Sequence, residues 1–286
     1  GVLSVRVSND LMGKDPQYGV PKQMRVEYTL DGVAGTVTVA ENQNLRLPAA
    51  AWRSIPPAPV VRSGELVSFA KEKHTFTKPD ASKAVIETKA PQAPLSLTGP
   101  WQVSFQAGRG APATATFDRL ISLHEHADPG IRYFSGTAVW KTSFDVPQSA
   151  LAGSKSAIHL DLGRVAVIAG VKLNGQDLGI LWCDPFRVDV TKFLKPGSNQ
   201  IEIAVTNLWV NRLIGDEQEP ADVEWAGKPL AKWPDWFVKH GARPSKNRLT
   251  FTTWHHWQKG DALKPSGLIG PVLLRFATVT PLESAH

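Results

Sequence analysis

Alternating apolar and polar positions recur along the chain and predict β-strands. Gln23–Leu30 alternates, Asp31-Gly32 follows as a turn, and Thr36–Val39 alternates again, which predicts a β-hairpin. Leu45–Leu47 continues the pattern as a short third strand. We therefore expect residues 1–62 to form a small antiparallel β domain.

From Pro100 onward, short strand patterns are separated by Gly, Pro and Asn, which is typical of a sandwich or jelly roll. Helical periodicity is confined to single turns at Gln148–Leu151 and Val190–Leu194. The pattern predicts an all-β jelly-roll sandwich over residues 99–282. Its expected strands are Trp101–Gln106, Ala113–Phe117, Thr137–Val146, Ala157–Leu162, Ala166–Leu173, Arg187–Val190, Asn199–Thr206, Arg248–Trp254 and Pro271–Phe276.

The run Val171–Thr191 contains the strongest local signal. Asn174-Gly175 lies between two alternating segments and predicts a tight hairpin, because both turn residues must adopt positive φ. A corner follows, and then a third strand. The order of strand, turn, strand, corner and strand resembles the sugar-binding β-sandwich that accompanies many glycoside hydrolases.

Two segments interrupt the strand pattern. Ser54–Pro59 is proline-rich and predicts a stiff linker, and the polar residues 63–98 are interpreted as a linker or wrapping segment. Residues 208–247 form a long interval with four tryptophans and six carboxylates. Long loops inside compact domains are usually functional or disordered, and the tryptophan content argues against disorder.

Charge and composition exclude several classes of protein. The formal charge of +6 comes from scattered Lys and Arg, whereas nucleic-acid binders cluster them on one element. No apolar run is long enough to predict a membrane span, and the single cysteine, Cys183, excludes an internal disulfide framework. We expect Cys183 to be a small buried hydrophobe. Because the chain starts at Gly1 with no Met, we expect it to be processed or excised from something longer. We also expect a periplasmic or secreted bacterial protein.

Several motifs resemble one family, the bacterial α-L-rhamnosidases of glycoside hydrolase family 106, and in particular their C-terminal region with its galactose-binding-like sandwich. The segment Asp15–Lys22 resembles the small β domain that precedes that region. The Asn174-Gly175 hairpin alone indicates only the general class of sugar-binding sandwiches, whereas the run Trp209–Asp216 resembles this family in particular. The motifs are Gly99-Pro100-Trp101, Tyr133–Trp140, Leu160–Val165, Asn174-Gly175, Thr206–Asp216 and Ser266–Val272.

The resemblance implies an inverting enzyme with carboxylates in a (β/α)₈ barrel and a calcium ion near the sugar. The alternating strand and helix patterns of such a barrel are missing here, so no catalytic residue is transferred to this chain. We expect a non-catalytic, carbohydrate-binding part of a polysaccharide-degrading enzyme. Purified alone, the chain is then not expected to cleave an aryl α-L-rhamnoside.

Three roles remain open at this point. The first is glycan binding at one end of the sandwich, with a rhamnose-containing glycan as the partner. The second is a scaffold that packs on the parent enzyme's catalytic domain, and the third is donation of a loop to the parent's active site. Nucleic acid and membrane are not expected partners. The candidate carbohydrate-binding residues are Trp209, Asn211, Arg212, Asp216, Trp225, Trp233, Trp236 and Trp257.

The carboxylates of residues 216–224 have two further interpretations. They are candidate calcium ligands, although no cofactor is expected to be required. The simpler interpretation is an ion pair between Arg212 and Asp216 that anchors the loop, so that Arg212→Ala destabilises the domain by roughly 1–3 kcal/mol. The pairs His124/His126 and His255/His256 lack the converging ligands of a zinc site. Trp101 and Trp140 lie in predicted strands and are assigned to the core.

Overall fold

The structure is a computed structural model that describes residues 3–8, 22–30, 33–47, 57–77, 81–151 and 157–282. The chain divides into two compact units, Gly1–Ile55 and Pro56–His286. Of the run Asp15–Lys22, all but Lys22 lies outside the described residues, as do the Asp31-Gly32 turn and residues 54–56 of the proline-rich linker. The predicted division at residues 62 and 98 stays a prediction.

The smaller unit contains two antiparallel strand pairs. β2 (Gln23–Leu30) pairs with β3 (Val33–Ala40), which confirms the hairpin that the alternating pattern predicts. β1 (Leu3–Arg6) pairs with β4 (Asn44–Leu47), so the short third strand is also present.

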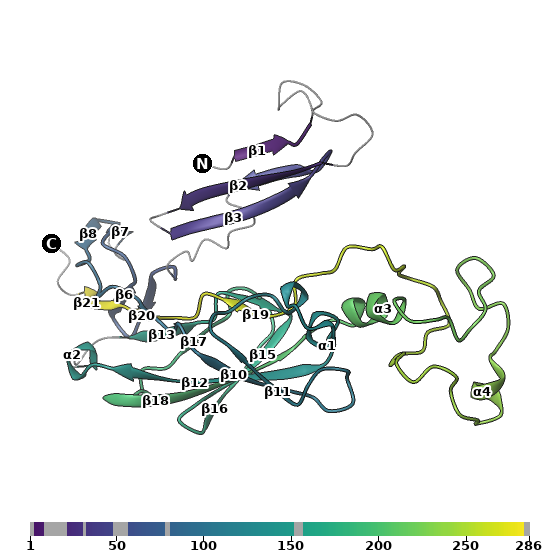
Figure 1. The fold of residues 1–286 in the computed structure, drawn as a ribbon. Coiled ribbons are helices and arrows are strands. Elements are labelled where there is room, and N and C mark those ends of the chain that lie inside the picture. The colour runs from purple at the N-terminus through teal and green to yellow at the C-terminus, as the bar shows by residue number, and fades with distance from the viewer. Residues whose placement is uncertain are drawn as a thin grey trace. The chain divides into compact units, whose positions relative to one another are not determined.

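The larger unit contains a β-sandwich, and the predicted all-β fold class is confirmed (Figure 1). One sheet has six antiparallel strands in the order β11-β10-β12-β18-β15-β16, and the other has four in the order β17-β13-β20-β9. The six are β11 (Thr114–Phe117), β10 (Trp101–Phe105), β12 (Thr137–Val146), β18 (Gly197–Thr206), β15 (Ile168–Leu173) and β16 (Gln176–Leu181). The four are β17 (Arg187–Asp189), β13 (Ile158–Asp161), β20 (Leu273–Phe276) and β9 (Leu95–Ser96).

The sandwich core follows from the two-residue period of its strands. Successive side chains of a strand point to opposite faces of the sheet, so every second residue is buried. Trp140 of β12 and Ile203 of β18 lie opposite each other in register and are both buried. Trp101 of β10 is also fully buried, so the assignment of Trp101 and Trp140 to the core is confirmed.

The Asn174-Gly175 turn joins β15 and β16 as the sequence predicts. Its φ angles of +51° and +80° are the left-handed conformation that this pair of residues tolerates. The Asn174 side chain also donates to Asn199 Oδ1 at 2.8 Å and accepts from Gln200 N–H at 3.0 Å. The turn residue therefore connects the hairpin to the neighbouring strand β18.

Outside the two main sheets, residues 57–97 contain strands that the weak periodicity did not resolve. β6 (Glu65–Ser68) lies between β5 (Val60–Arg62) and β21 (Thr278–Pro281), and β7 (Lys73–Thr77) pairs with β8 (Lys83–Glu87). A further pair is β14 (Arg164–Ala166) with β19 (Gly267–Gly270). The short helices are η1 (Leu123–Glu125), α1 (Pro129–Arg132), α2 (Gln148–Leu151), α3 (Val210–Asp216) and α4 (Asp235–Val238).

Two predictions from the sequence are wrong, and one helix was missed. Residues 248–254 form no strand, because Leu249 and Thr250 donate their backbone N–H groups to the Asp216 side chain instead of to a β-ladder. The helix α3 was not predicted. Cys183 is exposed, not buried, because it lies in the corner between β16 and β17.

Acidification is expected to destabilise the larger unit partly through His159 of β13. Burial lowers the pKa of His159 below its usual 6.5, with Arg62 and Arg187 acting in the same direction and Asp189 and Asp161 opposing them. A lowered pKa means that the unfolded chain takes up the proton first, so stability is lost as pH falls from about 6.5 toward the folded-state pKa. Urea unfolding at pH 7 and at pH 5 should show that His159→Gln loses less stability on acidification than the unchanged protein does. An equal loss in both proteins would contradict this role.

Candidate functional site

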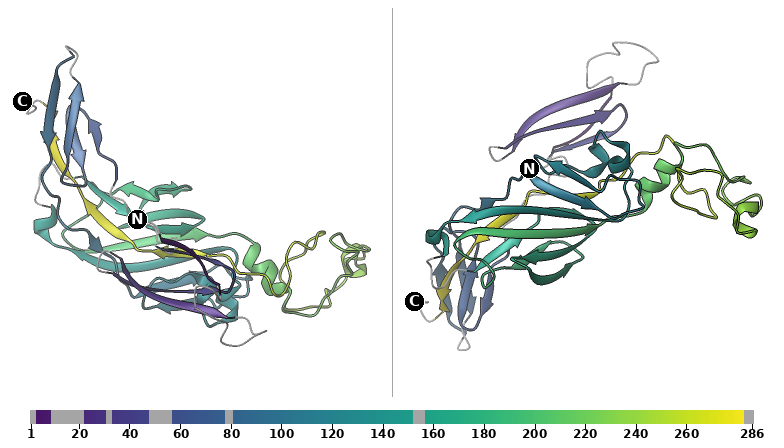
Figure 2. Two further views of the ribbon diagram at one scale, coloured as in Figure 1. Left: turned by 90° about the horizontal axis from the view of Figure 1, so that it is seen from above. Right: turned by 60° about the horizontal axis from the view of Figure 1, so that its bottom comes forward.

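Residues 208–265, called the arm below, extend from one end of the sandwich and return to it (Figure 1, Figure 2). The arm begins directly after β18, where Asn207 fixes the chain. The Asn207 side chain accepts from Gly136 N–H at 2.8 Å and donates to Phe134 O at 2.9 Å. The exit of the arm from the sheet is therefore set by hydrogen bonds to the sandwich.

The helix α3 is the base of the arm and packs closely on the sandwich. Ile214 is buried, and a Cβ atom added to Gly215 would lie 2.6 Å from the Cβ of Tyr133, so only glycine permits this approach. Asn211 accepts from Lys264 N–H at 2.8 Å and donates to Lys264 O at 2.7 Å. Asn211 thus holds the outgoing and returning ends of the arm together.

Arg212 and Asp216 form the predicted ion pair, which is confirmed. Arg212 Nε lies 3.0 Å from Asp216 Oδ1, and both side chains are buried. Asp216 also accepts hydrogen bonds from Leu249 N–H, from Thr250 N–H at 2.7 Å and from the Thr250 hydroxyl. One carboxylate therefore fixes the returning segment on the last turn of α3.

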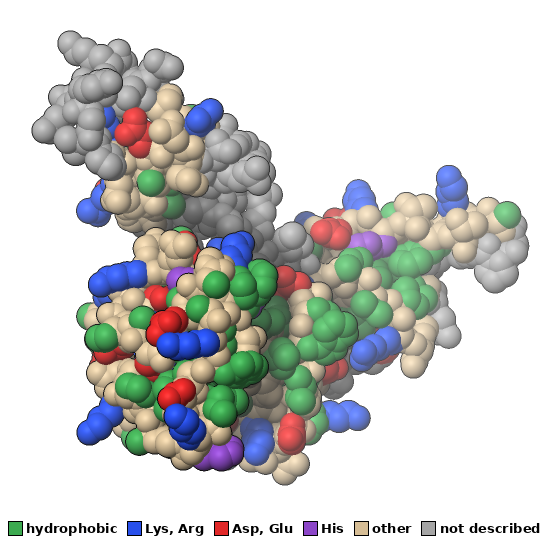
Figure 3. Space-filling model, turned by 90° about the vertical axis from the view of Figure 1, so that its right-hand side faces the viewer, with side chains coloured by type: hydrophobic (Ala, Val, Ile, Leu, Met, Phe, Trp, Pro, Cys, Tyr) green, Lys and Arg blue, Asp and Glu red, His purple; other side chains and the backbone are tan. Residues whose placement is uncertain are grey.

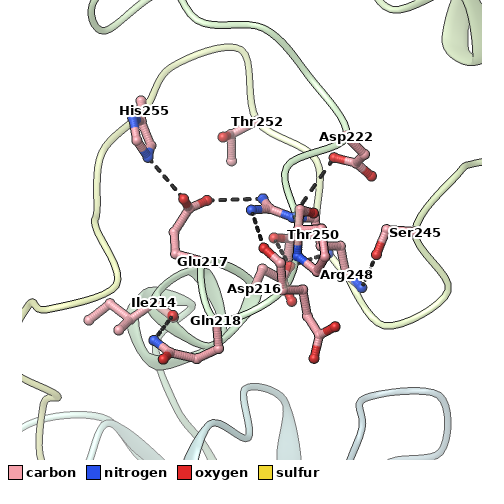
Figure 4. Close-up of polar contacts among 12 residues, drawn as sticks. Ile214, Asp216, Glu217, Gln218, Asp222, Ser245, Arg248, Thr250, Thr252 and His255 are labelled. Atoms are coloured by element: carbon pink, nitrogen blue, oxygen red, sulfur yellow. Dashed lines mark hydrogen bonds and ion pairs between the residues drawn. The ribbon is translucent and has the colours of Figure 1, made fainter.

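A second set of polar contacts, beyond α3, also joins the outgoing and returning segments of the arm (Figure 4). Arg248 donates through Nη1 to Glu217 Oε1 at 3.0 Å, and through Nε and Nη2 to the Pro220 and Glu219 carbonyls at 2.9 and 3.1 Å. His255 Nε2 lies 3.1 Å from the other oxygen of Glu217. Glu217 is held between a guanidinium and an imidazole, which fixes its orientation.

Asp222 contributes a further carboxylate, and its side chain is buried. Its Oδ2 accepts from Arg243 Nε, and Arg243 also donates to Arg248 O at 3.0 Å. Asp222 Oδ1 is buried without a hydrogen-bond partner among the described residues and lies 4.0 Å from Arg248 Nε. The acidic segment 216–222 and the basic residues of the returning segment therefore neutralise each other.

These groups surround a hollow that is also lined by Trp225 and Trp257. Its cavity volume is about 30 Å³, which accommodates roughly two water molecules but no sugar ring. Across the described residues, no group of three or more His, Cys, Asp or Glu side chains has the arrangement of a metal site. A volume of this size suits the arm's internal packing better than the binding of a sugar.

Aromatic side chains form the outer part of the arm. Phe237 stacks on Phe251 with ring centroids 4.9 Å apart and on Trp233 at 5.4 Å, and Trp236 meets Phe251 edge-on. Trp225 stacks on His255 at 4.8 Å with an interplanar angle of 4°. This small aromatic cluster holds the arm's outer part in a defined shape.

The eight candidate binding residues fall into two sets. Asn211, Arg212 and Asp216 come together at the base of the arm, buried and engaged in internal hydrogen bonds. The tryptophans are spread over the arm. Trp209 and Trp233 are 52% and 55% exposed, and Trp225, Trp236 and Trp257 are partly buried. Their proposed role in carbohydrate binding stays a prediction.

Sequence reasoning missed the partners that complete this network, namely Arg243, Arg248 and the pairing of His255 with Glu217. A usable signal was present, because the acidic segment 216–224 and the basic residues 239–248 lie in one loop. Opposite charges on the two sides of a loop predict pairing. Which side chains pair could not be read from that pattern.

Residues 118–268 match the family model described as the glycosyl hydrolase 2 galactose-binding domain-like family. The chain is similar to a Formosa agariphila protein named "Putative beta-glucuronidase", with 40% identity over 95% of this chain. It is also similar to the solved structure of a rhamnosidase from Novosphingobium sp. PP1Y, with 32% identity over 88% of this chain and a TM-score of 0.53. The chain spans 23% of the first protein and 19% of the second.

Proposed function

We propose that the chain, which belongs to the glycosyl hydrolase 2 galactose-binding domain-like family, is the ancillary β-sandwich of a longer enzyme. That enzyme would be a glycoside hydrolase of the α-L-rhamnosidase type. In this proposal the arm docks on the remainder of that enzyme. The observation that carries the proposal is the distribution of side chains on the arm: the polar groups at its base are used internally, while several large apolar side chains of its outer part are exposed.

The exposed apolar side chains lie on two parts of the arm, at α4 with the residues just before it and on the returning segment. Trp233, Phe237, Val238 and Trp254 are each 45% exposed or more. Figure 3 views the molecule from the side of the arm and shows hydrophobic side chains at the surface among charged ones. Single exposed apolar residues need no explanation, but a group of them indicates a contact surface. Aromatic residues are also enriched at protein interfaces.

The polar side chains at the base of the arm also favour docking on protein over glycan binding. A glycan site needs hydrogen-bonding groups that are free to meet hydroxyls. Asn211, Arg212 and Asp216 are instead committed to the arm's own closure. Docking on protein uses the aromatic side chains without requiring these three residues.

The rhamnosidase assignment is supported by the sequence motifs and by the similarity to the Novosphingobium rhamnosidase, which extends over most of this chain. The curated relative carries a β-glucuronidase name, so the test includes both substrates. The full-length product of the gene is expected to hydrolyse an aryl α-L-rhamnoside and not an aryl β-D-glucuronide. The opposite preference would overturn the rhamnosidase part of the proposal.

Docking is tested by hydrogen exchange. In the full-length gene product, amides of residues 230–256 are expected to exchange more slowly than in the 286-residue chain. Val238→Lys should abolish that protection by placing a charge in the contact. Val60→Lys, the same change at a 48% exposed valine of β5, is the matched control and should leave it intact. Equal exchange in both proteins would exclude docking.

The same two variants separate the alternatives for the arm. If the arm donates a loop to the active site, Val238→Lys lowers kcat/KM of the full-length enzyme. If it serves only as a scaffold, Val238→Lys lowers the melting temperature and leaves kcat/KM unchanged. Glycan binding by the arm, the remaining alternative, predicts that the 286-residue chain binds a rhamnose-rich polysaccharide and that Trp233→Ala removes that binding.

A further inference from the structure

The outer face of the six-stranded sheet carries side chains in rows that cross the strands. Antiparallel register places Lys141 opposite Glu202, Glu202 opposite Lys172, and Lys172 opposite Asp177. These four residues alternate in charge from β12 to β16. Lys141 Nζ and Glu202 Oε2 form an ion pair at 2.9 Å. The row is therefore charged but has no net charge.

The next row on the same face is apolar. It lies two residues away along β12, β18 and β15 and, because the pairing of β15 with β16 is irregular here, three residues away along β16. Val139 lies opposite Ala204, Ala204 opposite Gly170, and Gly170 opposite Ile180. Because same-face rows are about 6.6 Å apart, the short side chains leave a depression beside the charged row. The floor of this depression, which we call the sheet groove, consists of Val139, Ala204 and Gly170.

The sheet groove is a defined hollow with an open edge. It has a volume of about 200 Å³, and Ile180, 69% exposed, stands at one end. A second hollow of about 480 Å³, lined by Gln102, Ser143 and Gln200, lies on the other side of the charged row. Glu202 borders both hollows. The charged row is thus reachable from both sides.

Gly170 borders an irregularity in the pairing of β15 with β16, which lies between Gly170 and Lys172, and there is room for a side chain at this position. Its φ lies outside the left-handed region, and an added Cβ would meet only Ala204 atoms at 3.9 Å or more, which is ordinary van der Waals contact. Glycine weakens a strand interior, and its presence there often marks a bulge or the close approach of a ligand or of another backbone. Gly170 keeps the groove open at a cost to the sheet.

We propose that the sheet groove binds a neutral glycan chain. A sugar ring has an apolar C–H face and a rim of hydroxyls. The floor of Val139 and Ala204 fits the apolar face. In the charged row the solvent-exposed carboxylates of Glu202 and Asp177 can accept from adjacent hydroxyls, and the ammonium groups of the row's two lysines can donate to them. A protein partner fits less well, because interface cores are depleted of charged residues. This site lies on the sheet face and is independent of the arm and its docking.

The test is affinity electrophoresis of the 286-residue chain in gels that contain soluble galactomannan, xyloglucan, arabinoxylan or arabinogalactan. At least one polysaccharide is expected to retard the chain. Gly170→Gln fills the groove and should weaken the retardation tenfold or more, with the melting temperature unchanged or raised. Glu202→Gln keeps the shape of the charged row but loses an acceptor charge, and should weaken binding about fivefold.

Ser198→Gln is the matched control, because Ser198 lies on β18 on the same face and outside both hollows. It should bind like the unchanged chain. Three results would each overturn the proposal: no retardation by any of the four polysaccharides, full retardation of Gly170→Gln, or equal loss in Gly170→Gln and Ser198→Gln.

Discussion

Replacing Asp216 with alanine is expected to destabilise the larger unit by about 3–5 kcal/mol, because it removes one partner of a buried ion pair and leaves Arg212 buried without it. Asp216 also accepts from the backbone N–H groups of Leu249 and Thr250. These donors lose their acceptor at the same time. Arg212→Ala should cost less, roughly 1–3 kcal/mol, because Asp216 keeps its backbone donors.

Urea unfolding followed by tryptophan fluorescence measures this effect, since every tryptophan except Trp52 lies in the larger unit. Limited proteolysis shows whether the arm opens first, as cleavage within residues 217–247. Asp235→Ala is the control: Asp235 lies on α4 of the same arm, in an exposed ion pair with Lys239, and its loss should change stability by no more than about 0.5 kcal/mol. Equal stability of the Asp216 and Asp235 variants would refute the anchoring role.

A similar loss of about 3–5 kcal/mol is expected for Asp161→Ala in the four-stranded sheet. Asp161 of β13 is fully buried, and its Oδ2 accepts from Arg187 Nε of β17 at 2.9 Å and from Arg275 Nε of β20 at 2.7 Å. Its Oδ1 accepts from Gly163 N–H at 3.1 Å. One carboxylate thus compensates two largely buried guanidinium groups and links three strands.

The same unfolding experiment tests this prediction. Asp161→Asn keeps the shape of the side chain but removes its charge, and should also be strongly destabilised. Asp145→Ala, at an exposed position of β12, serves as the control and should remain within about 0.5 kcal/mol of the unchanged protein. A stable Asp161→Asn variant would mean that shape, and not charge, holds these strands together.

The local pattern of the sequence determined most of the sandwich. Alternation predicted β10, β12, β15 and β18, because a strand buried on one face must repeat every two residues. Asn174-Gly175 predicted its own turn, since few other residue pairs adopt two positive φ angles. The pairing of Arg212 with Asp216 was also predicted, because opposite charges lie close together in the sequence; the helix that places them four positions apart on one face was not.

Other features depend on contacts between distant segments, and the tertiary structure alone decided them. α3 has seven residues, too few for a stable isolated helix, and it is held by the sandwich and by Thr250. Residues 248–254 look like a strand locally, but their backbone donors meet Asp216 instead of a neighbouring strand. The sheet groove depends on register, which sets Gly170 beside Ala204 across two strands. A local pattern specifies which face of a strand is apolar; only the fold specifies which residues of other strands lie beside it.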